Sequence, residues 1–216
     1  MIKKTVMFTG DSVVDADRGR PLGDWLHGLG NGFVSHIFAC AWAADPTFDI
    51  NILNTGTGGN TSRDLLRRYD AEVLAYKPDY VFIMVGINDC WREFDCFPTN
   101  GEMAPSVEEY KANMTEMVKK TQASGAKVAL VSPYFLERDH ENKMRAKCDK
   151  LNEALADISK EYGCEYISVV ETMDTFIAAQ SSYPLSGDRI HPRPIGKQII
   201  ANAIIASDTW KEIAAK

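Results

Sequence analysis

The chain lacks the features by which secreted, membrane-spanning and nucleic-acid-binding proteins are recognised. Its 5 cysteines are odd in number, widely scattered and include no Cys-x-x-Cys pair, so they predict reduced thiols and argue against a disulfide framework. The net charge of −6, with basic residues dispersed and outnumbered, provides no electrostatic footprint for nucleic acid or an anionic membrane. The longest apolar stretches are strand-sized and fall short of the roughly 20 residues that a membrane span requires. We therefore expect no nucleic-acid partner and no membrane partner.

A secretion signal and low-complexity segments are also missing. Lys3 and Lys4 precede an apolar run that stops at Gly10-Asp11, short of a signal-peptide core of about 7–15 residues. The 15 glycines and 9 prolines among 216 residues are too few for a low-complexity chain. We expect one cytoplasmic domain over residues 1–216, and the sequence leaves open whether it forms a homo-oligomer.

What the sequence does contain is an alternation of short apolar runs with longer segments of helical period, which is typical of β-α-β units. Strands are expected near Thr5–Thr9, Asp49–Asn54, Asp79–Gly86, Lys127–Ser132 and Glu165–Val169. Helices are expected over Phe33–Ala44, Thr61–Ala75, Ser106–Ser124, Arg138–Tyr162 and Pro194–Ser207. Continuously apolar strands suit a parallel sheet that is buried on both faces. The pattern predicts an α/β fold, a three-layer α/β/α sandwich with a central five-stranded parallel sheet.

Polar and glycine-rich segments follow three of the expected strands, at the edge of a parallel sheet where reactive groups gather. Ser12 comes after the first strand, in Gly10-Asp11-Ser12. The second strand is followed by "NTGTGGNTSRDLL" (54–66), whose backbone N–H groups and helix N-terminus can face negative charge. The third is followed by "GINDCWREFD" (86–95), which contains Asn88 and Asp89. Each segment alone also fits an ordinary turn or helix cap.

A further pair lies near the C-terminus, where Asp188 precedes His191 by three residues. One turn at this spacing can bring the carboxylate to the Nδ1–H of the imidazole, which leaves Nε2 free as a base. A serine, a backbone donor, an amide and an oriented histidine are the groups that ester hydrolysis in such a sheet uses. Taken together, the segments predict an ester hydrolase.

No cofactor motif accompanies these segments. From Gly56, the third glycine of a dinucleotide fingerprint would fall on Thr61, and a Walker lysine is missing. His27, His36 and His140 lack metal-ligand spacing, so we expect them at the surface or in packing. We expect no metal and no cofactor.

The sequence resembles the SGNH (GDSL-type) hydrolase family in four blocks, which are Gly10-Asp11-Ser12, Gly59, Gly86-x-Asn88-Asp89 and Asp188-x-x-His191. The resemblance implies a flavodoxin-like sheet. It also implies that Ser12 is the nucleophile, that His191 is the base, and that Asp188 is the acid that orients this base.

The same resemblance implies an oxyanion hole, made of the backbone N–H groups of Ser12 and Gly59 and the side-chain amide of Asn88. Gly58 stays open as the alternative to Gly59. The motif G-x-S-x-G, which builds the strained elbow of α/β-hydrolases, is absent. We therefore expect Ser12 on a looser loop after the first strand, and Asp11 as a local structural residue.

Longer stretches resemble a bacterial branch of the family that includes intracellular acetylxylooligosaccharide esterases, among them "NTGTGGNTSRDLLRR" and "KPDYVFIMVGINDCWREFD". This resemblance implies a serine esterase for short-chain acetyl esters, with an acetylated sugar as its small-molecule substrate. Trp91 and Arg92, directly after Asn88-Asp89, are candidates for the substrate pocket, and packing of the loop is the alternative. Two other classes stay open: a lysophospholipase or acyl-thioesterase with a longer acyl channel, and a flavodoxin-like module that binds an anion at the Gly-rich loop.

Overall fold

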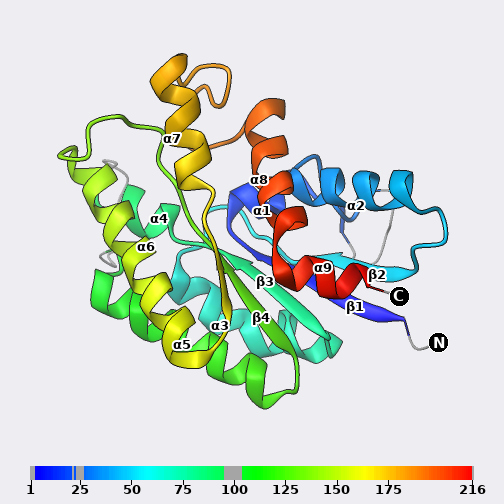
Figure 1. Cartoon of the computed structure of the whole chain (residues 1–216). Helices are drawn as coiled ribbons and strands as arrows, with labels where there is room; N and C mark the ends of the chain where they lie inside the picture. The colour runs from blue at the N-terminus through cyan, green and yellow to red at the C-terminus, as the bar shows by residue number, and fades with distance from the viewer. Residues whose placement is uncertain (1–2, 21, 23–26, 95–103, 216) are drawn as a thin grey trace.

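Five parallel strands form the central sheet of the computed structural model, which describes residues 3–20, 22, 27–94 and 104–215. In chain order the strands are β1 (Lys4–Gly10), β2 (Ile50–Asn54), β3 (Tyr80–Met84), β4 (Lys127–Val131) and β5 (Glu165–Ile167). Their order in the sheet is β2-β1-β3-β4-β5, and every neighbouring pair is parallel (Figure 1). The expected α/β fold with five parallel strands is confirmed. Cys96, one of the five thiols, lies outside the described residues.

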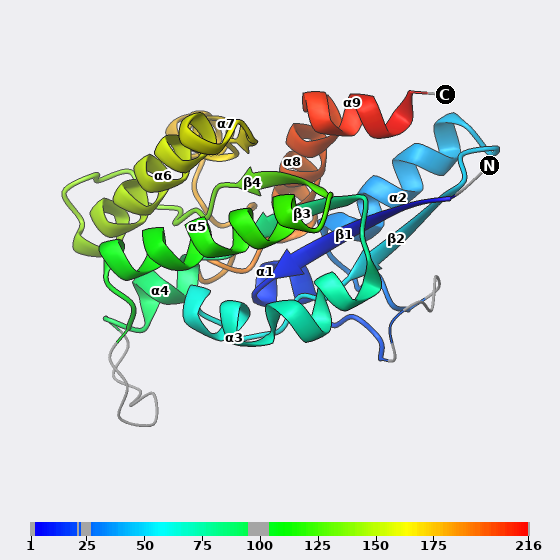
Figure 2. The same ribbon diagram turned by 90° about the horizontal axis from the view of Figure 1, so that it is seen from below.

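Helices cover both faces of this sheet, as the views in Figure 1 and Figure 2 show. One face packs against α2 (Phe33–Ala44), α7 (Val170–Ala179), α8 (Pro194–Ala206) and α9 (Asp208–Ala214). The other face packs against α3 (Ser62–Glu72), α5 (Val107–Ala123) and α6 (Lys143–Tyr162). The expected three-layer sandwich is therefore confirmed. No helix within the described ranges has the length and apolar character needed to cross a membrane.

The two faces are buried because successive residues of a strand point to opposite sides. Val6 and Phe8 of β1 belong to the apolar cluster under α2 and α8, whereas Met7 between them belongs to the cluster under α3 and α5. All five residues of β3 are buried. This explains why the strands appear in the sequence as continuous apolar runs rather than as alternating ones.

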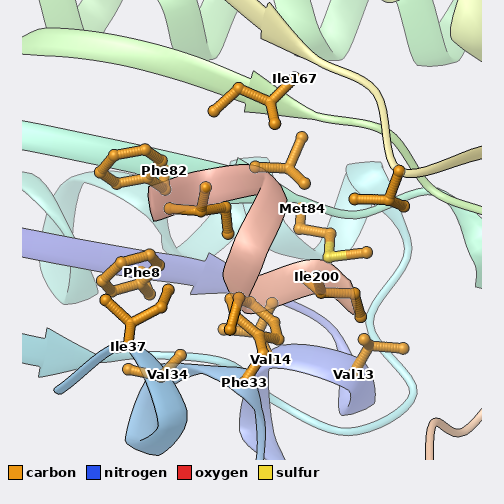
Figure 3. Close-up of a cluster of buried hydrophobic side chains, with 14 of the residues drawn as sticks. Phe8, Val13, Val14, Phe33, Val34, Ile37, Phe82, Met84, Ile167 and Ile200 are labelled. Carbon is orange, nitrogen blue, oxygen red and sulfur yellow. The ribbon is translucent and has the colours of Figure 1, made fainter. Parts of the chain in front are cut away.

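Stacked aromatic rings occupy the cluster under α2 and α8 (Figure 3). Phe8 and Phe82 are partners across β1 and β3, and their rings stack with centroids 4.9 Å apart and planes 13° apart. Phe33 of α2 meets Phe8 edge-on at 6.0 Å. Ile200 of α8 is 0% exposed in the same cluster. The rings tie the centre of the sheet to the helical layer above it.

Several element ends differ from expectation because side-chain caps set them. α6 begins at Lys143 rather than near Arg138, since the Asn142 side chain accepts hydrogen bonds from the N–H groups of Met144 and Arg145. After α8, the Ser207 side chain accepts from the Trp210 N–H and starts α9, which was not expected.

Other differences concern short elements. α1 (Ser12–Asp15) and α4 (Ile87–Trp91) were not expected, because one turn of helix shows no apolar period in a sequence. α7 was not expected either. A 3₁₀ turn at Leu74–Tyr76 follows α3, whereas a continuous helix to Ala75 was expected, and β3 and β5 each end two residues before their expected ends.

The packing of α8 predicts very different costs for one substitution at two positions of this helix. Ile200→Ala should lower the free energy of unfolding by about 2–5 kcal/mol, because it leaves a cavity in the core. Ile195→Ala is the matched control, since Ile195 is 46% exposed, and it should cost well under half as much. Urea unfolding monitored by circular dichroism measures both values. Equal losses would contradict the described placement of α8.

Candidate active site

Ser12 is separated from the last residue of β1 only by Asp11, lies at the carboxyl edge of the sheet, and is the first residue of α1. The expectation of a loop at this position is wrong. The Asp11 side chain accepts a hydrogen bond from the Val13 N–H at 2.9 Å and thereby caps a four-residue helix. Asp11 thus makes the kind of local structural contact expected for it. The backbone N–H of Ser12, in the first turn of this helix, has no intrahelical acceptor.

The structure brings Ser12 together with the C-terminal pair. Ser12 Oγ and His191 Nε2 are 2.9 Å apart, and His191 Nδ1 and Asp188 Oδ2 are 2.6 Å apart. The three side chains therefore form a continuous hydrogen-bonded chain. The His191 and Asp188 side chains are 45% and 48% exposed, so these hydrogen-bonded groups are accessible to an approaching substrate.

Hydrogen bonds at Asp188 set the proton arrangement of this chain. Burial favours the neutral acid, but hydrogen bonds from the His191 side chain and from the N–H groups of Ile190 and His191 outweigh it, and they hold the pKa of Asp188 well below its usual range. The Ser186 hydroxyl also donates to this carboxylate, at 2.8 Å. Because an ionised carboxylate only accepts, the proton of the neutral imidazole lies on Nδ1. Nε2 is then an acceptor for the Ser12 hydroxyl.

The backbone N–H groups of Gly58 and Gly59, in the glycine-rich loop after β2, differ in their hydrogen bonding. The Gly58 N–H donates to Asp15 Oδ2 at 3.0 Å, so it is already occupied. The Gly59 N–H has no acceptor among the residues that the structure describes. Gly59 has a φ of 81°, a left-handed conformation that glycine adopts without strain. The geometry therefore favours Gly59 over Gly58 as the residue whose N–H is available to an oxyanion.

Asn88 lies at the start of α4 and is 2% exposed. Its Nδ2 donates one hydrogen to the carbonyl oxygen of Asn60 at 3.0 Å. This bond fixes the amide next to the Gly-rich loop and leaves its second N–H hydrogen for another acceptor. Three groups therefore each have an N–H hydrogen without an acceptor among the described residues: the backbone N–H of Ser12, the backbone N–H of Gly59 and the side-chain amide of Asn88.

Arg68 of α3 is a supporting residue that the sequence analysis missed. Its guanidinium donates to the carbonyl oxygens of Gly10 at 3.0 Å and Thr55 at 2.8 Å, and to Asn60 Oδ1 at 2.6 Å. It therefore ties the end of β1 to the loop that carries Gly59. The helical period does not reveal this role, because only packing separates Arg68, 13% exposed, from Arg67, 59% exposed.

Two buried carboxyl groups, those of Asp11 and Asp89, belong to the sequence neighbours of Ser12 and Asn88. Burial raises the pKa of Asp11 to about 7, although the Val13 N–H and His191 act in the opposite direction. Burial likewise raises the pKa of Asp89 to about 7, although Asp89 accepts hydrogen bonds from the N–H and hydroxyl of Ser62. Asp89 thus anchors the first turn of α3 to α4.

A hollow of about 370 Å³ opens beside Ser12 and His191. Four polar side chains outside the hydrogen-bonded chain also line it, and they are Asp15, Asp17, Asn31 and Lys197. No sequence motif singles these residues out, because they come from three separate segments that only the fold brings together.

Trp91 and Arg92 also lie beside the chain of Ser12, His191 and Asp188. The rings of Trp91 and His191 have centroids 6.2 Å apart at 70°, in edge-to-face contact. The Arg92 guanidinium lies over the Trp91 ring, 5.1 Å from its centroid. A Cβ placed on Gly59 would meet Arg92 Nη2 at 3.9 Å. Arg92 therefore borders the site beside Gly59, and Trp91 borders it beside His191.

The remaining histidines lie outside this site. His36 Nδ1 is 3.0 Å from Gln198 Oε1, and His140 Nδ1 is 2.8 Å from Asp149 Oδ2. His27 is exposed. Over the part of the chain that the structure describes, no group of three or more His, Cys, Asp or Glu side chains is arranged to hold a metal ion.

A model of the GDSL-like Lipase/Acylhydrolase family matches residues 8–199. The chain belongs to this family. It is a carboxylic ester hydrolase, and its SGNH fold is the one that the four sequence blocks implied. The resemblance stated from those blocks is confirmed.

Individual relatives cover almost the whole chain. The acetylxylan esterase of Geobacillus stearothermophilus is 32% identical over 201 residues, which are 93% of this chain and 91% of that protein. The crystal structure of Axe2, an acetylxylan esterase from the same species, superimposes with a TM-score of 0.89 at 30% identity, over 99% of this chain and 95% of that one. Further Axe2 structures are described as catalytic mutants of a serine, an aspartate and a histidine. LAE5, described as an alpha/beta hydrolase enzyme from the metagenome of Lake Arreo, Spain, matches with a TM-score of 0.87 at 32% identity, over 99% and 97% of the two chains.

The raised pKa of Asp11 predicts a pH-dependent stability. The folded chain keeps a proton on Asp11 up to about pH 7, whereas an ordinary aspartate loses it near 3.8. Between these values the folded state binds more protons, so the free energy of unfolding falls as the pH rises. Asp11→Asn retains the oxygen that caps Val13 but cannot ionise. The variant should therefore gain stability relative to the wild type from pH 4 to pH 8.

Urea unfolding at several pH values measures this difference. Asp157→Asn is the control, because the Asp157 side chain is 60% exposed, and it should leave the pH slope unchanged. Parallel curves for the wild type and Asp11→Asn would contradict the pKa shift.

Proposed function

We propose that this esterase removes acetyl groups from sugars, such as acetylated xylo-oligosaccharides, through an acyl-enzyme on Ser12. The observation that carries the proposal is the continuous hydrogen-bonded series of Ser12, His191 and Asp188. Ser12 Oγ lies 2.9 Å from His191 Nε2, and His191 Nδ1 lies 2.6 Å from Asp188 Oδ2, beside three N–H donors that have a hydrogen available. Such a chain activates a hydroxyl for attack on an ester carbonyl. The catalytic serine, aspartate and histidine mutants described for Axe2 support the same roles for these three residues.

In the proposed reaction, Ser12 Oγ attacks the acetyl carbonyl carbon while His191 Nε2 takes the hydroxyl proton. The carbonyl oxygen becomes an oxyanion that accepts hydrogen bonds from the Ser12 and Gly59 N–H groups and from Asn88 Nδ2. One such donor contributes about 10²–10³ to kcat in serine hydrolases. Asp188 stabilises the imidazolium that forms in this step.

The tetrahedral intermediate then collapses, and the bond from carbon to the sugar oxygen breaks. His191 gives its proton to the departing sugar hydroxyl, and the acetyl group stays on Ser12 as an ester. A water molecule, deprotonated by His191, attacks this ester in the same way. Acetate leaves, and Ser12 recovers its proton.

The polar side chains that line the hollow support a sugar substrate over a lipid. Two carboxyl groups, an ammonium group and an amide line it, namely those of Asp15, Asp17, Lys197 and Asn31. These groups suit hydroxyls, whereas a long acyl chain would have to desolvate them without forming hydrogen bonds in return. The resemblance to acetylxylan esterases supports the same substrate class. The lysophospholipase or acyl-thioesterase alternative therefore takes second place, and membership of a hydrolase family disfavours the anion-binding module.

The other expectations remain predictions. We propose that residues 1–216 form one domain and that the protein acts in the cytoplasm, where imported oligosaccharides would be its substrates. A homo-oligomer stays open.

The substrate class is tested with acetyl, butyryl and octanoyl esters of 4-nitrophenol, together with acetylated xylo-oligosaccharides. We expect kcat/KM to fall about 10-fold or more from acetyl to butyryl and further to octanoyl, because a site that serves acetyl esters has to hold only a methyl group, and added methylenes would clash there. Acetylated xylo-oligosaccharides should be cleaved with release of acetate.

Ser12→Ala should abolish these activities with the fold intact, whereas the control Ser181→Ala, at an exposed position, should keep them. Higher kcat/KM for octanoyl esters or for lysophospholipids would contradict the sugar proposal in favour of the lipid alternative.

A further inference from the structure

We propose that the hollow beside Ser12 binds the sugar that leaves in the reaction, and that Lys197 and Asp17 select a neutral, hydroxyl-rich leaving group there. This inference rests on the proposed function and adds the residues that determine specificity.

The position of His191 places the leaving group in this hollow. The oxygen that departs with the sugar must lie near His191 Nε2, because it receives its proton from this atom. Among the described residues, the hollow is lined by Ser12 and His191 but by neither Gly59 nor Asn88. The carbonyl oxygen and the leaving oxygen therefore point in different directions, one toward the three donors and the other into the hollow.

Lys197 supplies a donor. It lies near the start of α8, is half-buried and lines the hollow. Within the described ranges its ammonium group has no hydrogen bond or ion pair to another side chain or to the backbone. A half-buried ammonium group without a protein partner has three N–H donors ready for a ligand's oxygen atoms.

Asp17 supplies an acceptor, and the turn that carries it is strained at Ala16. Ala16 and Asp17 have φ values of 42° and 59°, a left-handed conformation that an aspartate tolerates and an alanine seldom adopts. Hydrogen bonds hold this turn, from the Ala16 N–H to the Ser12 carbonyl at 3.0 Å and from the Asn31 N–H to the Ala16 carbonyl at 2.7 Å. Strain of this kind persists where the surrounding structure fixes it, and it gathers at ligand sites.

The charges around the hollow favour a neutral ligand over an anionic one. Asp15 is already engaged, because it accepts from the Gly58 N–H at 3.0 Å and pairs with Arg20 at 3.4 Å. Asp17 and Lys197 then offer one acceptor and one donor of opposite charge, and Asn31 offers both functions in a neutral amide. Sugar hydroxyls can donate to Asp17 and accept from Lys197 at the same time.

Lys197→Met tests the inference, because methionine keeps much of the apolar stem and removes the ammonium group. The measured quantity is the ratio of kcat/KM for acetylated xylobiose to kcat/KM for 4-nitrophenyl acetate, whose leaving group carries no sugar hydroxyls. We expect this ratio to fall roughly 10- to 100-fold, the effect of losing a hydrogen bond to a charged group. The loss should appear mainly in KM for the sugar.

Asp17→Asn is the second variant, since asparagine tolerates the left-handed conformation and the turn should survive. We expect the ratio of kcat/KM for acetylated xylobiose to kcat/KM for 4-nitrophenyl acetate to fall in this variant as well. Lys150→Met, at an exposed position of α6, is the matched control and should leave the ratio unchanged. Circular dichroism verifies that each variant is folded.

An unchanged ratio in Lys197→Met and Asp17→Asn would overturn the inference while leaving the proposed function intact. Equal losses on both substrates would overturn it as well, since they indicate a general effect on the site. A wild-type enzyme that cleaves 4-nitrophenyl acetate but no acetylated sugar would instead overturn the proposed function, and the inference with it.

Discussion

The close approach of β1 and β3 at the carboxyl edge of the sheet is the constraint on which the site depends. Gly10 pairs with Met84 in the register of these strands, and a Cβ on Gly10 would lie 1.8 Å from the Met84 carbonyl oxygen. Only a glycine fits there, and its absent side chain lets two chain segments leave the sheet side by side. One segment carries Ser12 and the other carries Asn88. A larger residue would push the Ser12 hydroxyl away from the Asn88 amide, and the proposed reaction needs both groups at one acetyl carbonyl.

Buried polar contacts then fix what the strand pairing brings together. The Asp11 cap starts a helix at Ser12, Asp89 holds Ser62, and Arg68 joins the Gly10 and Thr55 carbonyls to Asn60. These contacts, most of them to backbone atoms, hold the segments that carry Ser12, Gly59 and Asn88. Enzymes lose large rate factors when catalytic groups shift by about 1 Å, so the proposed reaction depends on these supporting contacts.

The sequence predicted the sheet well because strands that are buried on both faces leave continuous apolar runs, as in β3 and β4. The hydrogen-bonded chain was predictable for a different reason: Asp188 and His191 are close in sequence, and Ser12 follows the first strand. The short helices α1 and α4, the inward turn of Arg68 and the grouping of Asp17 with Lys197 were not predictable. They arise from caps and from contacts between segments distant in the chain, which leave no local pattern.

The central claim is that His191 activates the Ser12 hydroxyl. Reaction with diethyl 4-nitrophenyl phosphate, followed by peptide mapping in a mass spectrometer, tests it directly, because this reagent transfers its phosphoryl group to an activated serine as nitrophenolate leaves. The account predicts one diethylphosphoryl group per chain, on Ser12, with labelling much slower in His191→Ala. Labelling at another residue, or an unlabelled enzyme that keeps its esterase activity, would contradict the account.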